Sequence, residues 1–357
     1  MKPIITAIIP TYRRPELLHR AIRSVLDQTF RQVRVSVYDN NSNDGTRAMV
    51  ESLIETDPRV TYHCHARNIG SLNNFEYGLQ QVRTPYYSFL SDDDMLLPGF
   101  YAEALQTLES RPNCVMSVFQ VIILATDGRL MGRNPGYFPA GEYRPPEGFL
   151  TMVKLGAPIW TGVLFRNEPP RHLEVAVGHL TDIEYLLRLA AGSGYCVVDR
   201  PGAIFTHDGK KKASYQHAKE RLFARQETLS NLYARIDGFG LPGRIADEAV
   251  RILNHHYGKK IYRTGLKCAS RREDGDLRKA IAILRDMDHE QHAALQTVLK
   301  LTSIIPPPFV RLLAALHILS NPKPRLPLGR NRRYRNKYGP FLQYENANVK
   351  MPGGSFR

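Results

Sequence analysis

The chain has 357 residues, of which 43% are hydrophobic, and it carries a formal net charge of +15. This length and composition support a large globular domain with an accessory region, and they exclude a low-complexity or disordered protein. The excess of basic residues indicates a polyanionic partner, either nucleic acid or an anionic membrane surface. No apolar run reaches the roughly 20 residues of a membrane-spanning helix.

The four cysteines, Cys64, Cys114, Cys196 and Cys268, lie far apart and have no CxxC spacing. They therefore predict neither a zinc site nor a disulfide framework, and a reducing compartment is expected. The first residues enter a strand-like segment without the apolar stretch of a signal peptide. We expect a cytoplasmic protein, or one bound peripherally to the inner face of the cytoplasmic membrane.

Short strand-like runs alternate with helical patterns over the first part of the chain. Strands are predicted over residues 4–9, 33–38, 60–63 and 86–90, and helices over residues 15–28, 46–55, 72–82 and 99–110. This order predicts an α/β fold of the Rossmann-like type, with a mostly parallel central sheet flanked by helices. In such sheets ligands gather at the carboxyl ends of the strands.

Beyond residue 124 the pattern becomes mixed. A hairpin turn is predicted at Asp127–Gly128, and the Gly- and Pro-rich residues 132–146 are predicted to form a loop over the ligand site. Further elements follow as a strand over residues 161–165, a helix over 182–191, and short strands over 196–198 and 203–205. Helices alone are predicted afterwards, over residues 218–236, 246–264, 276–286 and 291–301.

These patterns divide the chain into three regions. We predict an α/β domain over residues 1–212, a helical region over 213–320, and a basic tail rich in Pro and Gly over 321–357. The apolar residues 302–320 either lie in a membrane interface or pack as a helix on the first domain. A basic tail after such a segment would add attraction to anionic lipids.

Three consecutive carboxylates, Asp92, Asp93 and Asp94, follow the predicted strand over residues 86–90. Like charges this close repel one another unless a proton or a divalent metal neutralises them. Oxygen ligands without thiols favour Mg²⁺ or Mn²⁺. The alternative is an acidic turn that caps the next helix.

Four motifs occur in the order found in family 2 glycosyltransferases of the GT-A fold, which the chain resembles over residues 4–110 and more weakly to about Ser214. They are Ile8–Arg14, Val37–Thr46, Ala66–Gly70 and Phe89–Asp94. The resemblance implies an inverting, metal-dependent enzyme with a helical C-terminal extension. Its donor would be a nucleotide-diphosphate sugar, with UDP-sugar favoured, and its acceptor a hydroxyl of a glycan or a lipid-linked sugar.

The resemblance also implies a donor site. Asp39 would accept a hydrogen bond from uracil N3, Tyr12 would stack on the base, and Arg67 would meet the diphosphate. The alternatives are a loop cap for Asp39, an aromatic at the core edge for Tyr12 and a surface position for Arg67. The remaining implied donor-site residues are Pro10, Thr11, Asn68, Asp92, Asp93, Trp160 and Gly162. For Trp160 the alternative is an aromatic of the hydrophobic core.

For the metal, the resemblance makes Asp94 the direct ligand of Mn²⁺ or Mg²⁺, with His207 as a second ligand or an ordinary loop histidine. Many relatives have Asp-Ser-Asp-Asp where this chain has Ser91–Asp94. For the general base, the resemblance implies Asp182, although Thr181 replaces the usual Glu. The alternative is that Asp182 only favours the start of a helix, in which case Glu184 is the substitute base.

Two other functions compete with this interpretation. A sugar nucleotidyltransferase shares the architecture, but no Gly-rich phosphate loop follows the first strand. A nucleic-acid-binding protein would explain the charge, but no known binding module is present and the basic residues concentrate in the tail. We therefore expect a nucleotide-sugar donor, a glycan or lipid-linked acceptor and peripheral contact with an anionic membrane as partners, and no nucleic acid.

Overall fold

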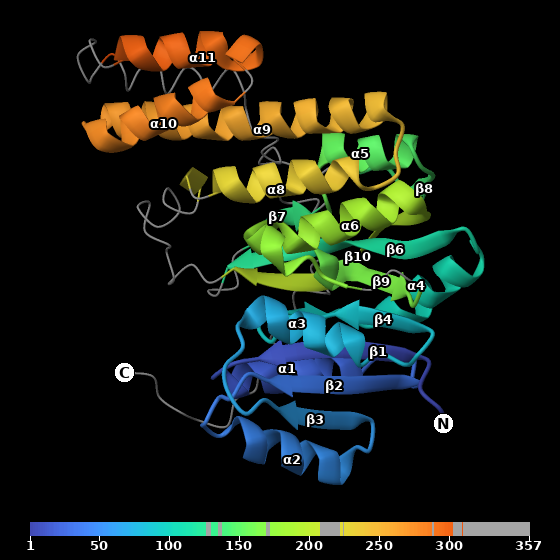
Figure 1. The fold of residues 1–357 in the computed structure, drawn as a ribbon. Helices are drawn as coiled ribbons and strands as arrows, with labels where there is room; N and C mark the ends of the chain where they lie inside the picture. The colour runs from blue at the N-terminus through green and yellow to red at the C-terminus, as the bar shows by residue number, and fades with distance from the viewer. Residues whose placement is uncertain are drawn as a thin grey trace.

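The structure is a computed structural model, which describes residues 1–125, 130–134, 138–168, 172–207, 222–223, 225–287, 289–302 and 309. Its centre is a ten-stranded sheet in the order β3-β2-β1-β4-β9-β6-β10-β5, with β7 paired to β6 and β8 to β10. Helices cover both faces, and the C-terminal helices stack at one side (Figure 1). The α/β class with a helical C-terminal region is confirmed.

The strands are β1 (Ile5–Thr11), β2 (Val33–Asp39), β3 (Val60–Cys64), β4 (Tyr86–Phe89), β5 (Met95–Leu96), β6 (Cys114–Ala125), β7 (Leu130–Asn134), β8 (Gly141–Tyr143), β9 (Val163–Arg166) and β10 (Gly194–His207). The helices are α1 (Pro15–Leu26), α2 (Thr46–Thr56), α3 (Ser71–Gln80), α4 (Phe100–Glu109), α5 (Glu147–Leu155), α6 (Thr181–Gly192), α8 (Arg225–Asp237), α9 (Gly243–Ser270), α10 (Asp274–Asp286) and α11 (His289–Thr302). Two 3₁₀ helices complete the set, η1 (Trp160–Gly162) and η2 (Val175–Leu180).

The four strands of the N-terminal half form the predicted parallel layer. β1 pairs in parallel with β2 and β4, and β2 pairs in parallel with β3. Ile5, Ala7 and Ile9 pack in the same cluster as the buried side of α1, whereas Ile8 belongs to the cluster that contains Leu79 of α3. Because successive side chains of a strand point to opposite faces, α1 and α3 cover opposite faces of β1.

The second half of the sheet is mixed, and two predictions made for it are wrong. Residues 132–146 are not one loop, because β7 pairs antiparallel with β6 and β8 pairs antiparallel with β10. The two short strands over 196–198 and 203–205 are one strand, β10, whose register shifts around Pro201. The partner of β8 lies far away in the sequence, on β10, so local composition did not indicate this strand. β7 pairs with β6, the strand directly before it. The turn at Asp127–Gly128 lies outside the described residues.

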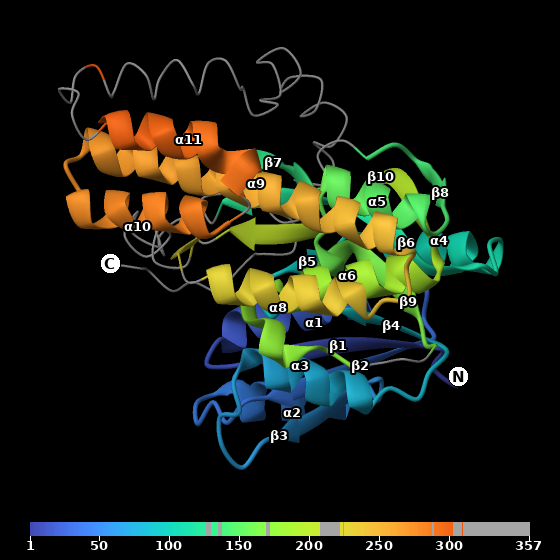
Figure 2. The ribbon, with the colours of Figure 1, turned by 45° about the horizontal axis from the view of Figure 1, so that its top comes forward.

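The C-terminal helices share a core with the sheet. One hydrophobic cluster runs from Phe89 on β4 through Tyr185 on α6 to Ile261 on α9 and Leu299 on α11. Figure 2 shows α10 and α11 packed along α9. A Cβ atom at Gly265 would lie 2.6 Å from a methyl group of Leu299, so glycine allows the close approach of α11 to α9.

The predicted boundary near residue 212 lies outside the described residues, and the three-region division stays a prediction. The tail over 321–357 is also outside them, as are Lys210, Lys211 and Lys212. Within the described part of the chain, every helix is too short or too polar to cross a membrane.

Candidate active site

The polar residues predicted for the site meet at one edge of the parallel layer. Thr11 ends β1, Asp39 ends β2, and the acidic triplet follows β4. Thr11 Oγ1 donates a hydrogen bond of 2.8 Å to Asp92 Oδ2, which ties the ends of β1 and β4 together. Pro10 is buried in β1, directly before Thr11. The edge where the strands end in carboxylates is therefore the candidate active site.

Two arginines of the first helical segment hold the acidic triplet. Arg14 Nη1 lies 3.0 Å from Asp92 Oδ1 and 2.8 Å from Asp93 Oδ2, so one guanidinium bridges two carboxylates. Arg20 Nη2 donates to the Asp93 carbonyl at 2.7 Å and to Thr206 Oγ1 at 3.2 Å. Burial raises the pKa of Asp92, and the charge of Arg14 opposes that rise. Sequence reasoning assigned no role to either arginine.

Asp94 is the most enclosed member of the triplet, with no exposed surface. Its Oδ2 accepts a hydrogen bond of 2.9 Å from Thr161 Oγ1, and its Oδ1 accepts one of 2.9 Å from the Thr206 backbone N–H. Burial, followed by the charge of Asp93, raises the pKa of Asp94 to about 8. The side chain thus joins the end of β4 to η1 and β10. In contrast, the side chain of Asp93 is 31% exposed.

Asp39 lies at the other end of the site and is 2% exposed. Its Oδ1 accepts hydrogen bonds from the Ser42 backbone N–H at 2.9 Å and from Ser42 Oγ at 2.6 Å. Its Oδ2 accepts a hydrogen bond of 2.6 Å from Tyr62 Oη. Each carboxylate oxygen therefore already has a fixed donor, which sets the orientation of the carboxylate. Ser42 lies within the Val37–Thr46 motif but the sequence indicated no role for it, and Tyr62 lies outside the four motifs.

Tyr12 follows Thr11, the register partner of Asp39, and is 37% exposed. The guanidinium of Arg13 lies 5.0 Å from the centre of the Tyr12 ring, within cation–π distance. Arg13 is held in turn, because its N–H donates to Ser42 Oγ at 2.8 Å and its Nε donates to the Ser42 carbonyl at 3.1 Å. The loop after β2 and the loop after β1 are thereby joined.

A third loop is attached through two asparagines. Asn40 Nδ2 donates to Asn68 Oδ1 at 2.8 Å, and the backbone N–H of Ile69 donates to Asn40 Oδ1 at 2.7 Å. This contact places residues 66–70 next to the end of β2. Arg67, directly before these two anchors, is exposed on the surface of the same loop.

Trp160 and Gly162 support the site from inside. The Trp160 ring is 8% exposed and lies 4.5 Å from the Phe89 ring and 4.8 Å from the Phe75 ring, measured between centroids. It is therefore a core aromatic. At Gly162 a Cβ atom would lie 2.6 Å from Val121, so glycine lets η1 approach β6 closely. Both residues position Thr161, which donates to Asp94.

Asp182 is the second residue of α6 and is half-buried. Its Oδ1 accepts a hydrogen bond of 2.9 Å from the Ile183 backbone N–H, a contact with the start of its own helix. Glu184 is fully buried and lies 2.9 Å from Arg188 Nε, so it is committed to an ion pair. His207 ends β10, and its side chain lies outside the described residues.

The carboxylates of the triplet fit a hard divalent cation only if a bound substrate supplies further oxygen ligands. Within the described ranges, no group of three or more His, Cys, Asp or Glu side chains is arranged to hold a metal ion. Mg²⁺, however, is commonly bound by one or two carboxylates together with substrate phosphates and water. The partly exposed carboxylate of Asp93 meets that requirement if a diphosphate supplies the other oxygens.

The strand order, the helices on both faces and the carboxylates at the strand ends define a fold of the GT-A type. Residues 6–169 match the family model described as "Glycosyl transferase family 2". Solved structures share the fold along most of the chain. TarS 1-349 of S. aureus in complex with UDP-GlcNAc has a TM-score of 0.61 at 16% identity and covers 85% of this chain and 88% of that one. The mannosyltransferase PcManGT from Pyrobaculum calidifontis, in complex with GDP-Man and Mn²⁺, has a TM-score of 0.53 at 17% identity over 98% and 89% of the two chains.

The chain therefore resembles the family 2 glycosyltransferases through its residues 6–169, just under half of its length, and has the GT-A fold. It is 37% identical over 112 residues to the GalNAc(5)-diNAcBac-PP-undecaprenol beta-1,3-glucosyltransferase of Campylobacter jejuni, covering 31% of this chain and 35% of that protein. It is 26% identical to the putative teichuronic acid biosynthesis glycosyltransferase TuaG of Bacillus subtilis, over 36% of this chain and 50% of that protein. The matched part thus spans between about a third and half of these relatives.

Proposed function

We propose that this protein transfers a sugar, with inversion, from a nucleotide-diphosphate donor to a hydroxyl of a glycan or lipid-linked acceptor. The observation that carries the proposal is the convergence of Asp39 and the Asp92–Asp94 triplet at one edge of the sheet, joined through Thr11. Asp39, with both oxygens oriented by fixed donors, is suited to accept a hydrogen bond from a base N–H. Tyr12 offers a partly exposed ring face.

UDP-sugar is the favoured donor. Support comes from the S. aureus TarS structures that contain UDP and UDP-GlcNAc, which share the fold, and from the position of Asp39. The C. jejuni relative acts on an undecaprenol-linked acceptor according to its name. A lipid-linked acceptor would place the protein at the inner face of the membrane, where its positive charge favours anionic lipids.

We further propose that Asp93, rather than Asp94, is the carboxylate that meets Mn²⁺ or Mg²⁺. Asp94 has no exposed surface and both of its oxygens accept hydrogen bonds, whereas Asp93 is partly exposed beside Arg14. Asp94 is better suited to position the triplet. The metal, when bound, would neutralise the diphosphate and favour its departure. Arg14 would hold Asp92 and Asp93 in place and supply further positive charge.

Asp182 is proposed as the general base that accepts the proton of the acceptor hydroxyl. It is half-buried at the start of α6, whereas Glu184 two residues later is fully buried and paired with Arg188. The buried ion pair with Arg188 already engages the Glu184 carboxylate. A carboxylate near the first turn of a helix is favoured in its ionised form, which is the form that a base requires.

The test is a thermal-shift panel with UDP, GDP, dTDP and CMP, each with Mn²⁺ and with EDTA. Specific ligands raise the melting temperature by mass action. We expect UDP with Mn²⁺ to raise it and UDP with EDTA to raise it less. Asp93→Asn should remove the effect of Mn²⁺, and Asp94→Asn should retain part of it. If no nucleotide raises the melting temperature under either condition, the donor-site proposal is wrong.

A further inference from the structure

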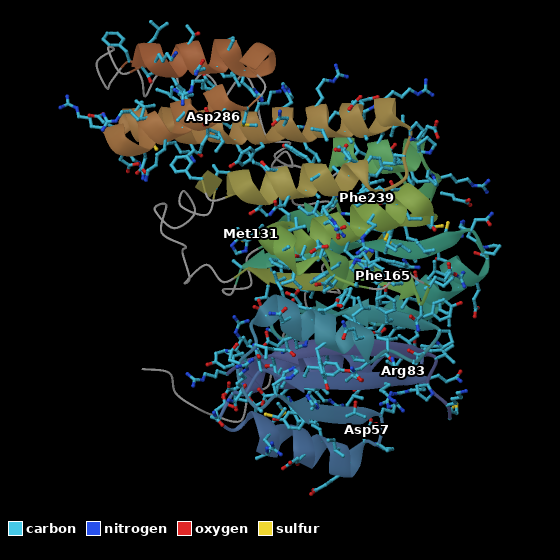
Figure 3. All side chains as sticks on the ribbon, in the orientation of Figure 1. Asp57, Arg83, Met131, Phe165, Phe239 and Asp286 are labelled. Carbon is cyan, nitrogen blue, oxygen red and sulfur yellow. The ribbon has the colours of Figure 1, made fainter. Side chains whose placement is uncertain are left out.

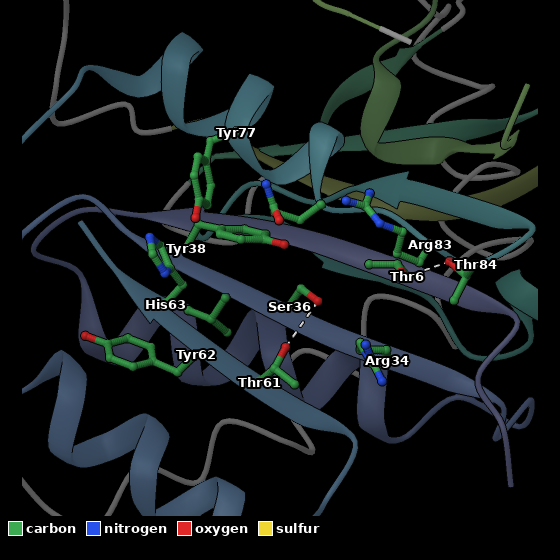
Figure 4. Close-up of a pocket in the computed structure, with 12 residues that line it drawn as sticks. Thr6, Arg34, Ser36, Tyr38, Thr61, Tyr62, His63, Tyr77, Arg83 and Thr84 are labelled. Carbon is green, nitrogen blue, oxygen red and sulfur yellow. Dashed lines mark hydrogen bonds between the residues drawn. The ribbon is translucent and has the colours of Figure 1, made fainter. Parts of the chain in front are cut away.

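A cavity of about 270 Å³ lies on the α3 side of the sheet, over strands β1, β2 and β3 (Figure 4). It begins near the carboxyl ends of the strands at Tyr38 and His63 and runs toward their amino ends at Thr6 and Arg34. In Figure 3 Arg83 and Asp57 mark that second end of the sheet. Most of the cavity therefore lies away from the edge where the acidic triplet stands.

The cavity exists because α3 covers only part of this face. At Gly78 of α3 a Cβ atom would lie 2.9 Å from the Tyr38 ring, so the helix sits tightly over the end of β2. Among the described helices, none lies above the outer strand β3 on this side. Thr61 and His63 of β3 are exposed there, next to Ser36 and Tyr38 of β2. The face is open and polar, unlike the α1 and α2 side, which is closed and apolar.

The floor of the cavity is lined with hydroxyl groups. Thr61 Oγ1 donates to Ser36 Oγ at 3.2 Å, and Thr6 and Thr84 share a hydrogen bond of 2.7 Å between their hydroxyls. A hydroxyl has one donor and two acceptor positions, so a paired hydroxyl still has capacity for a ligand. Such a row matches the alternating donors and acceptors of a sugar.

One wall is aromatic. The His63 and Tyr77 rings are stacked, with centroids 4.8 Å apart and planes inclined by 19°. The Tyr38 ring meets Tyr77 edge-on at 5.6 Å. Figure 4 shows these rings on one side of the hydroxyl floor. Aromatic rings beside hydroxyls form a surface on which the apolar face of a sugar ring can pack.

The rim is positively charged. Among the described residues that line the cavity there are two arginines, Arg34 and Arg83, and neither Asp nor Glu. Arg83 Nη1 donates to the carbonyls of Gln80 and Val82 at 2.6 and 2.9 Å, which fixes its guanidinium at the rim. The exposed Arg34 guanidinium forms no hydrogen bond or ion pair with the described part of the chain. It is available for an anion, which a guanidinium can bind through two parallel bonds.

We propose that this cavity is a second binding site, for a small anionic sugar of the sugar-phosphate class. Arg34 and Arg83 would bind the phosphate, Ser36 and Thr61 the sugar hydroxyls, and Tyr77 the sugar ring. The volume is near the lower end of the range of about 300–1,000 Å³ found for ligand pockets, which favours a single sugar unit over a chain. The site is distinct from the proposed donor site and does not depend on it.

The experiment is isothermal titration calorimetry on the full chain with glucose 6-phosphate, glucose and inorganic phosphate as probes. We expect glucose 6-phosphate to bind more tightly than either of the other two, because only it engages the rim and the floor together. Arg34→Gln should weaken its binding about tenfold or more, the effect of losing a charge-assisted pair. Arg34 is exposed and has no hydrogen bond or ion pair within the described ranges, so this variant should fold normally. Thr61→Val should weaken binding without changing the charge.

The matched control is Arg67→Gln, which removes an exposed arginine from the proposed donor site and leaves the cavity unchanged. Glucose 6-phosphate should bind this variant as it binds the wild type. Loss of binding in Arg67→Gln with retention in Arg34→Gln would place the probe at the donor site and overturn the proposal. Equal affinity for inorganic phosphate and glucose 6-phosphate would also overturn it, because the site would then bind anions only. If none of the three probes bound, the proposal would likewise be overturned.

Discussion

The hydroxyl of Tyr62 on β3 donates a hydrogen bond of 2.6 Å to the carboxylate of Asp39 at the end of β2. Burial, followed by this hydrogen bond to Asp39, raises the pKa of Tyr62 far above its usual value, so the hydroxyl keeps its proton at any working pH. Together with Ser42, Tyr62 fixes both oxygens of the residue proposed to recognise the nucleotide base. Tyr62, on the neighbouring strand β3, thus orients the carboxylate of Asp39, a residue that the sequence motifs had already indicated.

Tyr62→Phe removes this donor and leaves the ring in place. We expect the affinity for UDP to fall about tenfold, because a hydrogen bond to a charged group contributes about 1.5 kcal/mol or more. Calorimetric titration of UDP measures the change. Tyr101→Phe is the control, since the Tyr101 hydroxyl bonds to Ser88 in the core and should not affect UDP. Equal affinity in both variants would mean that Tyr62 does not orient Asp39 for binding.

Asp94 should make stability depend on pH when metal is absent. Its pKa is raised from 3.8 to about 8 in the folded state, first by burial and then by Asp93. Between these values the folded protein binds more protons than the unfolded chain, so the free energy of unfolding falls as pH rises through this window. The neutral Asp94→Asn should therefore gain stability relative to wild type as pH rises.

With EDTA present, we expect the melting temperature of Asp94→Asn, minus that of wild type, to increase by at least about 2 °C between pH 5 and pH 9. Calorimetric scans at several pH values measure it. Asp247→Asn, an exposed change on α9, is the control and should show a constant difference. A constant difference for Asp94→Asn as well would show that its carboxyl titrates normally.

Asp182→Asn should retain donor binding and lose turnover by about 100-fold or more, since general bases contribute factors of this order. Turnover is measured as UDP release, and donor binding as thermal shift. Glu184→Gln separates the two candidate bases. It breaks the buried ion pair with Arg188 and should lower the melting temperature while changing the rate per folded molecule little. If Glu184→Gln lost turnover per folded molecule and Asp182→Asn retained it, Glu184 would be the base.

The contact between α9 and α11 gives a prediction about the C-terminal helices. Gly265→Ala places a methyl group 2.6 Å from Leu299 and should destabilise the protein by about 1–3 kcal/mol through overpacking. Gly275→Ala on α10 is the matched control, because nothing lies within 4 Å of its new Cβ atom. It should leave stability unchanged or raise it, since alanine favours helix. Thermal unfolding compares the two variants, and equal melting temperatures would show that α11 is loosely packed.

Much of the N-terminal half follows from local sequence. Pro15 at the first position of α1 and the apolar spacing of Leu18, Ala21, Ile22 and Val25 determine a helix with one buried side. Apolar runs after turns determine β1 and β2 in the same way. Because parallel strands end at the same edge, the sequence also indicated that Asp39 and the acidic triplet lie near one another. These features depend on contacts within one element or on a simple order of elements.

Only the tertiary structure decided the chemistry of individual carboxylates. Asp92, Asp93 and Asp94 are equivalent in the sequence, yet Arg14 pairs with the first two while Thr161 and Thr206 enclose the third. The strand β8, Tyr62 beside Asp39 and the open face over β2 and β3 likewise arise from residues distant in the chain. Burial and hydrogen bonding depend on such distant partners, and they set the pKa and the accessibility of a side chain. Residue type and spacing therefore determined which groups gather at the site, and long-range packing determined what each one can do.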